Sequence, residues 1–308
     1  MRTAERIEWD QLPEGVRATV EQRLGARLMR AWTPVGGFSH GMAARLEFAN
    51  GRRVFAKAID VADELAGMYR VESRTAARLP KDVPAPRVLF DLEHAGWLVT
   101  VFEDVAGRHP RFDRPGELAA ALAAVAQLAQ VLNPCPLEGI PTIAESYGAV
   151  FGRWLAFAES DAPADLDVWA VRNLTRLAEL EGEWSTRTMG NTLLHTDLRP
   201  DNMLRRADGT VVVVDWAWPC RGAAWVDLVS LGPSIAACGV DPDPILAEHP
   251  VTRAIDPRAV DAYLCALVGY WAHSSRMPVP SRSPRLREHH ANAYRVSRDW
   301  LRRRVGWS

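Results

Sequence analysis

The sequence of 308 residues contains no apolar run that approaches the roughly 18 residues of a membrane span. Its polar start, Met1–Arg6, leads into no apolar signal core. The net charge is only -1, so no overall electrostatic field would recruit nucleic acid or a membrane surface. We therefore expect a cytoplasmic protein without membrane or nucleic-acid partners. The sequence does not indicate its oligomeric state.

Cysteine and lysine are also scarce. The four cysteines are far apart and show no paired spacing, which favours small, mostly buried residues over disulfides or a zinc site: Cys135, Cys220, Cys238 and Cys265. Among the 37 lysines and arginines, only Lys57 and Lys81 are lysines. The surroundings of each lysine are therefore informative.

The order of predicted elements indicates an α+β fold with two lobes. With 48% hydrophobic residues, the chain is long enough to bury two separate cores. Strand patterns are predicted at 46–49, 53–59, 87–91 and 97–102, and helices at 10–29, 62–79, 116–132, 145–159, 165–184, 223–237, 257–275 and 283–305. We predict a small antiparallel-sheet lobe over 1–104 and a mainly helical lobe over 105–308.

The most informative stretch is His195-Thr196-Asp197, followed by Asn202 and then by Asp215. Apolar strands precede and follow these residues, and a hairpin is predicted around Asp208-Gly209. Oxygen-bearing side chains at strand ends can bind a hard divalent cation and accept a proton from a hydroxyl. Three residues at these offsets also coincide by chance in about one chain in a hundred. The hairpin and the four-valine strand supply the context that the motif requires.

A second candidate segment is the glycine loop with Gly36, Gly37 and Ser39. Glycine has no Cβ, so backbone amides here can approach phosphate oxygens closely. The alternative is an ordinary glycine hairpin.

Lys57 lies among apolar residues in the strand that follows the Asn50-Gly51 hairpin signal. A lysine in this setting either extends to solvent at a sheet edge or is buried with a partner. The helix predicted at 62–79 offers Glu72 as the favoured partner and Glu64 as the competing one.

These residues resemble the aminoglycoside phosphotransferase family, the small-molecule branch of the protein-kinase-like fold. Gly36-Gly37-Phe38-Ser39 looks like the family's nucleotide loop, and Lys57 with Glu72 looks like its ion pair. The 195–202 segment looks like its catalytic loop, and Val214-Asp215-Trp216 looks like its metal motif. Trp225-Val226-Asp227-Leu228 resembles the segment whose aspartate supports that loop.

The resemblance implies a two-lobed kinase-like fold and ATP with Mg²⁺ as cofactors, with GTP as an alternative nucleotide. Lys57, held by Glu72, would orient the phosphates, while Asn202 and Asp215 would ligate Mg²⁺. Asp197 would accept the proton of the acceptor hydroxyl.

The remaining roles that the resemblance implies concern support and base recognition. His195 and Asp227 would support the catalytic loop. Backbone groups of Glu103 and Val105 would read the adenine edge, unless this segment is a plain connector.

The acceptor is expected to be a small molecule. Asp227 follows Asp215 by only twelve residues, and the Ala-Pro-Glu anchor of protein kinases is absent. An antibiotic, such as an aminoglycoside, and a metabolic alcohol of the choline or homoserine type are both compatible with this. A protein kinase and a nucleotide-binding pseudoenzyme are the competing interpretations.

Charge does not identify the acceptor. Six carboxylates could attract a polycation, although a solvated helix face explains them better: Asp161, Asp165, Asp167, Glu179, Glu181 and Glu183. Residues 276–308 carry nine arginines against only Glu288 and Asp299, which disfavours a polycation. The twelve tryptophans are expected mainly in cores.

Overall fold

The structure is a computed structural model that describes residues 4–160 and 162–308. Its internal contacts divide the chain into two units, described separately below. Unit 1 comprises Met1–His109, Asp201–Trp218 and Val279–Leu286, and unit 2 comprises Pro110–Pro200, Pro219–Pro278 and Arg287–Ser308. The predicted lobes, 1–104 and 105–308, remain a prediction.

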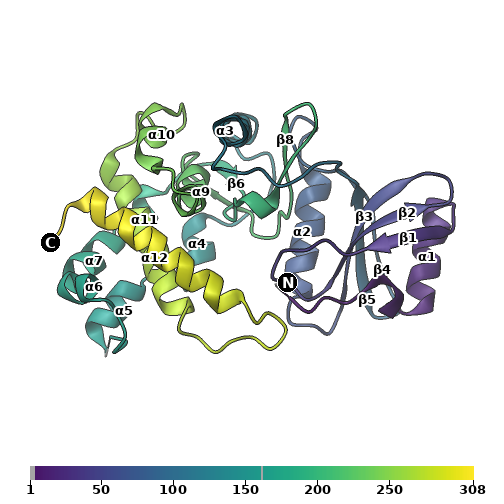
Figure 1. Cartoon of the computed structure of the whole chain (residues 1–308), viewed down its shortest axis with the longest axis horizontal. Helices are drawn as coiled ribbons and strands as arrows, with labels where there is room; N and C mark the ends of the chain where they lie inside the picture. Colours follow the sequence, from purple (N-terminus) through teal and green to yellow (C-terminus); the bar gives the residue numbers. More distant parts are fainter. Residues whose placement is uncertain (1–3, 161) are drawn as a thin grey trace. The chain divides into compact units, whose positions relative to one another are not determined.

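Unit 1 is built on a five-stranded antiparallel sheet with the strand order β1-β2-β3-β5-β4. The strands are β1 (Leu28–Trp32), β2 (Met42–Phe48), β3 (Arg53–Asp60), β4 (Val88–His94) and β5 (Trp97–Glu103). The unit also contains the 3-10 helix η1 (Trp9–Gln11), the last two residues of the 3-10 helix η2 (Pro200–Asn202), the helices α1 (Glu14–Leu24) and α2 (Ala66–Arg78), and the hairpin β7 (Met203–Arg205)–β8 (Val211–Val213). Figure 1 shows the sheet between α1 and α2.

Strand alternation assigns the two faces of β3. Val54, Ala56 and Ala58 are buried against α1 in the main core of the unit. Ile59 packs with α2 on the other face. Because successive strand side chains point to opposite faces, Phe55 and Lys57 share the α2 face with Ile59. The predicted Asn50-Gly51 hairpin is present, with Gly51 at φ 78°.

The helix predicted over 10–29 is too long. Helix α1 ends at Leu24 because Gly25 adopts the left-handed conformation, at φ 71°, that commonly ends helices. Residues from Leu28 then pair with β2, although Leu28 continues the four-residue apolar spacing. Asp10 lies in η1 and does not cap α1, whose N-cap is Pro13.

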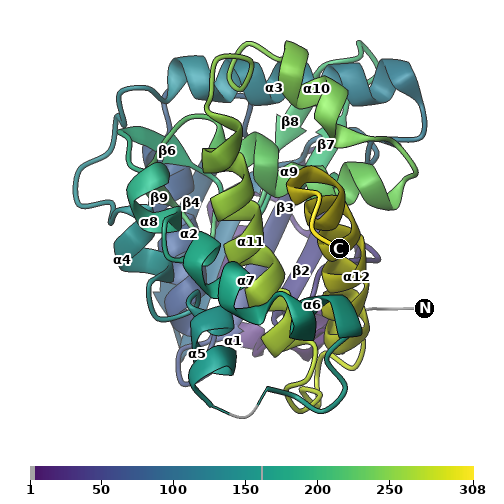
Figure 2. The same ribbon diagram turned by 90° about the vertical axis from the view of Figure 1, so that its left-hand side faces the viewer.

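Unit 2 is mainly helical, as predicted for this part of the chain. Its helices are α3 (Pro115–Val131), α4 (Ile143–Tyr147), α5 (Arg153–Glu159), α6 (Val168–Arg172), α7 (Leu174–Glu181), α8 (Trp184–Arg187), α9 (Val226–Ala237), α10 (Pro242–Glu248), α11 (Pro257–Ser274) and α12 (Leu286–Val305). The short strands β6 (Thr192–Leu194) and β9 (Cys220–Gly222) pair in antiparallel fashion. In Figure 2, α5, α7 and α11 pack together toward the viewer.

Two predicted helices of unit 2 are broken into shorter ones. The helix predicted at 145–159 divides into α4 and α5 around Gly152, which has φ 82°. The 165–184 segment forms α6, α7 and α8, and α10 has no predicted counterpart. Seven of the twelve tryptophans are buried, so the core interpretation holds for most: Trp9, Trp154, Trp169, Trp184, Trp216, Trp225 and Trp300. Among the described residues, no helix has both the length and the apolar content to cross a membrane.

Candidate active site

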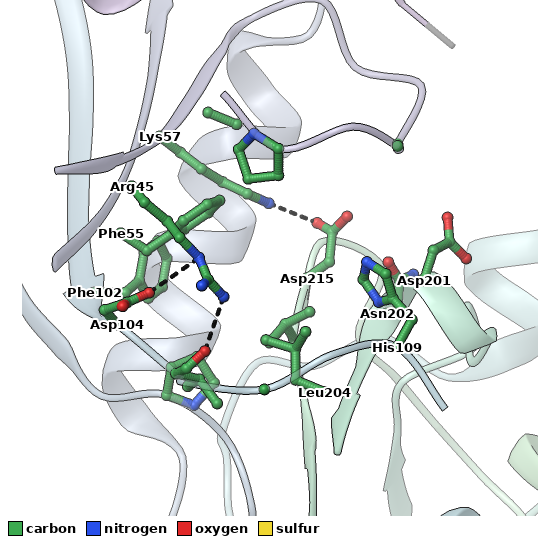
Figure 3. Close-up of a pocket in the computed structure, with 18 of the residues that line it drawn as sticks. Arg45, Phe55, Lys57, Phe102, Asp104, His109, Asp201, Asn202, Leu204 and Asp215 are labelled. Atoms are coloured by element: carbon green, nitrogen blue, oxygen red, sulfur yellow. Dashed lines mark hydrogen bonds and ion pairs between the residues drawn. The ribbon is translucent and has the colours of Figure 1, made fainter. Parts of the chain in front are cut away.

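Lys57 is held by two carboxylates on the α2 face of the sheet. Its Nζ lies 2.6 and 2.7 Å from the two carboxylate oxygens of Glu72 and 2.9 Å from Oδ1 of Asp215. The expected ion pair with Glu72 is therefore present, and the competing candidate, Glu64, is exposed. Figure 3 shows Lys57 pointing toward Asp215.

The charges of this cluster depend on one another. Burial lowers the pKa of Lys57, but the carboxylates of Asp215 and Glu72 raise it by more, so the net change is a rise. Burial raises the pKa of Glu72 to about 7, and the ammonium group opposes this rise. With Nζ in contact with both carboxylate oxygens, Lys57 stays protonated and Glu72 is held as its counter-ion.

The β7–β8 hairpin brings Asn202 and Asp215 together. Met203 pairs with Val213, and the Val214 amide donates to the Asn202 carbonyl at 2.9 Å. This register puts the side chains before β7 and after β8 at the same end of the hairpin. The hairpin was predicted from Asp208-Gly209, and Gly209 has φ 89°.

The glycine loop between β1 and β2 is held by residues far away in the sequence. Gly36 and Gly37 have φ of 116° and 73°, which glycine tolerates without strain. Arg6 donates to the carbonyl oxygens of Ser39 and Pro34, both at 3.3 Å. A Cβ at Gly37 would meet the end of the flexible Arg6 side chain, which can shift, so the positive φ is the main reason for glycine at this position.

The connector after β5 contains a contact that sequence analysis missed. Arg45 on β2 donates from Nη2 to the Val105 carbonyl at 2.9 Å, and its Nε lies 3.2 Å from Oδ1 of Asp104. Figure 3 shows the Arg45 guanidinium pointing toward Asp104. Phe55 and Phe102 line the same end of the cavity with apolar surface, as a nucleobase requires.

All of the predicted nucleotide- and metal-binding residues line one cavity in unit 1, with a volume of about 420 Å³. They are Gly36, Gly37, Ser39, Lys57, Glu72, Glu103, Val105, Asn202 and Asp215. The same cavity is lined by five charged residues that sequence analysis missed, namely Arg6, Arg45, Asp104, Arg108 and Asp201. The named residues, from Arg6 to Asp215, lie up to 209 positions apart in the sequence and share one site.

The cavity offers oxygen ligands for one divalent cation. Asn202 is 4% exposed and supplies an amide oxygen, while Asp215 supplies a carboxylate. Among the described residues, no group of three His, Cys, Asp or Glu side chains could hold a metal by itself. This donor set suits Mg²⁺, which usually takes one or two protein ligands and completes its shell with phosphates and water.

The predicted catalytic loop lies in unit 2, directly after β6. The carboxylate of Asp227 on α9 accepts hydrogen bonds from the backbone amides of His195, at 2.9 Å, and Thr196, at 2.8 Å. Burial raises the pKa of Asp227, and His195 with these two amides opposes the rise. Asp197 follows this anchored turn, and its amide donates to Nδ1 of His195 at 3.3 Å. Its carboxylate is partly exposed.

Comparison with solved structures identifies the fold. An aminoglycoside phosphotransferase from Alicyclobacillus acidocaldarius subsp. acidocaldarius DSM 446 is 16% identical, with a TM-score of 0.56 over 91% of this chain and 92% of that chain. A thermostable mutant of aminoglycoside phosphotransferase APH(4)-Ia, solved with ADP and hygromycin B, is 14% identical, with a TM-score of 0.62 over 95% and 98%. Choline kinase LicA from Streptococcus pneumoniae is 12% identical, with a TM-score of 0.63 over 94% and 98%. These likenesses confirm the predicted α+β, kinase-like fold.

Comparison at the level of sequence identifies the family. No curated protein matches this chain. The family model for the phosphotransferase enzyme family, APH, matches residues 37–304. This range contains the glycine loop from Gly37 onward, the Lys57–Glu72 pair and the catalytic loop, and it covers most of the chain. The chain therefore belongs to the phosphotransferase enzyme family, which confirms the resemblance drawn from its motifs.

Proposed function

We propose that the protein transfers the γ-phosphate of ATP to a hydroxyl group of a small molecule. The observation that carries this proposal is the single cavity lined by Lys57, Glu72, Asn202 and Asp215. It combines a cation for phosphates, a buried counter-ion for that cation, and two oxygen ligands for a divalent ion. Phosphoryl transfer needs such positioning and charge neutralisation more than covalent help.

The phosphates and the base of the nucleotide would bind to different parts of the cavity. Lys57 and the glycine-loop amides would bind the phosphates, and Phe55 with Phe102 would enclose the base beside Glu103 and Val105. Asn202 and Asp215 would hold Mg²⁺, which supplies charge neutralisation on the phosphates.

Asp197 would serve as the general base. The acceptor oxygen forms a bond to the γ-phosphorus while the bond from this phosphorus to the β–γ bridging oxygen breaks. ADP leaves with that electron pair, and the hydroxyl proton passes to the Asp197 carboxylate. Asp227 and His195 would position the loop and would not touch the substrate.

The carboxylates of unit 2 offer little attraction to a polycationic acceptor. Four of the six candidate carboxylates are already engaged: Asp165 pairs with Arg276, Asp167 with Arg298, Glu183 with Arg187 and Arg258, and Glu181 binds the amides at the start of α5. Glu179 is exposed, and Asp161 lies outside the described residues. An antibiotic acceptor and a metabolic alcohol both remain within the proposal.

A transfer assay with ATP labelled at the γ-phosphate tests the function. The purified protein is incubated with Mg²⁺ and a panel of hydroxyl compounds, and labelled products are identified by mass spectrometry. Lys57→Ala should lower transfer by about two orders of magnitude or more, because it removes the phosphate-orienting cation. Lys81→Ala, which changes the exposed other lysine, is the matched control and should keep wild-type transfer.

Each outcome has a clear meaning. Label transfer that is lost in Lys57→Ala and retained in Lys81→Ala supports the proposal. Nucleotide binding without transfer to any acceptor or to water would make the protein a pseudoenzyme. Full transfer by Lys57→Ala would remove that lysine from the mechanism.

A further inference from the structure

Aromatic side chains of unit 2 connect the catalytic loop to α11. The hydroxyl of Tyr147 lies 2.7 Å from Oγ1 of Thr196, the residue before Asp197. The ring of Tyr147 contacts Phe151, with centroids 5.4 Å apart. Phe151 in turn contacts Tyr270 on α11, at 6.5 Å. Tyr147 and Tyr270 are partly exposed, so this aromatic surface is accessible beside the loop.

The contacts continue from α11 to α12 and return to Asp197. Tyr270 meets His290 on α12, with centroids 5.9 Å apart, and His290 lies 5.9 Å from His289. Nε2 of His289 is 3.4 Å from Nη1 of Arg199. Nε of Arg199 is 3.6 Å from Oδ1 of Asp197. We call this closed series of contacts the loop ring; it comprises Tyr147, Phe151, Thr196, Asp197, Arg199, Tyr270, His289 and His290.

The α12 side of the loop ring is cationic. Nη1 of Arg287 lies 3.2 Å from Nδ1 of His290, which adds a second guanidinium to that of Arg199. Burial lowers the pKa of His290, and the nearby His289, Arg287 and Arg199 add to this effect, so that the pKa is about 4. Asp197 is the only carboxylate in the loop ring. Arg287 and His289 are partly exposed, so a ligand can reach them.

A polycationic acceptor would meet the guanidinium group of Arg199 beside the proposed base and that of Arg287 beside His290. Their repulsion would oppose its binding, and Asp165, Asp167 and Glu183, which could offset it, pair with other arginines of unit 2. A carboxylate or a phosphate would instead be attracted by the Arg287 guanidinium, whose Nε donates to the Pro278 carbonyl at 3.0 Å and whose Nη2 can donate to the ligand. The aromatic side would cover apolar parts of the same molecule.

We propose that the acceptor is an anionic hydroxyl compound whose carboxylate or phosphate group is bound by Arg287 and His289 while its apolar body lies against Tyr147 and Tyr270. This inference rests on the proposed phosphotransferase function, since it names the class of molecule that receives the phosphate. It assigns substrate binding to α12, whose arginines the catalytic motifs do not explain.

The first test sorts acceptors by charge. A metabolite extract is separated by ion exchange into anionic, neutral and cationic fractions, and each fraction is incubated with enzyme, Mg²⁺ and γ-labelled ATP. Hygromycin B and choline serve as defined cationic probes. 4-(Hydroxymethyl)benzoate and its amide serve as a matched anionic and neutral pair.

Transfer mainly to acceptors of the anionic fraction, with the benzoate preferred over its amide, is the expected result. Transfer mainly to neutral or cationic acceptors overturns this inference while the phosphotransferase function stands. Label in no product contradicts the proposed function itself, so the two failures are distinguishable.

The second test changes α12. Arg287→Gln should raise the acceptor KM about tenfold, because the loss of a hydrogen bond between charged groups weakens binding by about this factor. The KM for Mg·ATP should stay unchanged. Arg287→Lys keeps the charge and should recover much of the loss. Arg295→Gln removes an exposed cation of the same helix outside the loop ring and should behave as wild type.

Two further results complete the test. His289→Gln replaces the imidazole by an uncharged amide and should also raise the acceptor KM. This second variant keeps the inference testable if Arg287→Gln does not fold. If Arg287→Gln and His289→Gln, both folded by their unfolding midpoints, match Arg295→Gln in acceptor KM, the inference is wrong.

Discussion

Thr196 and Asp215 have left-handed backbone conformations, with φ of 62° and 69°. Such a conformation costs a residue other than glycine on the order of 1 kcal/mol or more, so surrounding contacts must maintain it. The Thr196 amide donates a hydrogen bond to the Asp227 carboxylate, and the Asp215 carboxylate accepts one from Lys57. At the residue scale, the strain lies beside the proposed base and at a proposed metal ligand, where fixed geometry is most useful.

The proposed roles of Asp197 and Asp215 predict different mutant behaviour. Asp197→Asn keeps the shape and loses the charge of the base, so kcat should fall by about 10²–10⁴. Its affinity for Mg·ATP should change little, because the interaction is made mainly in the transition state. Asp215→Asn removes charge from a metal ligand, so it should weaken Mg·ATP binding about tenfold or more and raise the Mg²⁺ requirement.

Calorimetric titration of Mg·ATP together with steady-state rates distinguishes these roles. The two variants serve as controls for each other, because each replaces one carboxylate by an amide of the same size. Equal losses of nucleotide affinity in both variants, or full activity of Asp197→Asn, would contradict the division of labour.

At the scale of elements, α12 carries a buried histidine whose protonation is linked to stability. Burial lowers the pKa of His290 to about 4, whereas an unfolded histidine titrates near about 6.5. The unfolded state therefore takes up a proton first as the pH falls. The free energy of unfolding should decrease from about pH 6.5 toward pH 4, with a contribution approaching about 3 kcal/mol.

The variant His290→Asn lacks this titration and isolates its contribution. Between pH 7 and pH 4.5, wild type should lose more unfolding free energy than His290→Asn, as measured by urea unfolding. His94→Asn, which removes an exposed histidine instead, is measured beside it as the control. A constant offset between wild type and His290→Asn over this pH range would show that the titration of His290 is not linked to folding.

Elements with strong local patterns could be predicted from the sequence. The alternation around Lys57 predicted β3, Asn50-Gly51 predicted its hairpin, and the valine run predicted β8. Helix interiors were predicted better than helix ends. At Gly25 and Gly152, left-handed backbone ends or begins a helix within an apolar pattern that continues past the glycine.

Residues fixed by long-range contacts could not be predicted in this way. Arg6 reaches Ser39 across 33 positions, and Arg45 reaches Val105 across 60. No local spacing marks either arginine, and both are ordinary members of an arginine-rich sequence. The Lys57–Glu72 pair could be predicted from the sequence because a scarce lysine lies in a strand and the following helix offers few carboxylates. The loop ring of unit 2 likewise joins residues from separate helices, and the sequence does not indicate which side chains of these helices contact one another.

At the scale of the whole molecule, three separate segments of the chain make up unit 1. The segment Asp201–Trp218 belongs to unit 1, so Asn202 and Asp215 line the same cavity as Lys57. The motif that began the sequence argument is thereby divided, with Asp197 in unit 2 and Asn202 in unit 1. A contiguous sequence motif can therefore supply groups to two separately packed units.

The short path from Asp215 to Asp227 predicts the class of acceptor. Within these twelve residues, β9 pairs with β6, the Arg221 amide donates to Pro141 at 2.7 Å, and α9 begins at Val226. Little chain remains to form the extended segment with which protein kinases seat a peptide. We therefore expect transfer to small hydroxyl compounds and none to proteins.

The measurement is label transfer from γ-labelled ATP to casein and to a mixed library of serine- and threonine-containing peptides, beside the small-molecule panel. Asp197→Asn is the background control, because it should lower specific transfer to every acceptor by about 10²–10⁴. Label on protein or peptide should stay at that background while small-molecule products accumulate with the wild type. Robust wild-type transfer to a peptide hydroxyl that disappears in Asp197→Asn would mean that a short interval suffices to seat a peptide, and the expectation of a small-molecule acceptor would be wrong.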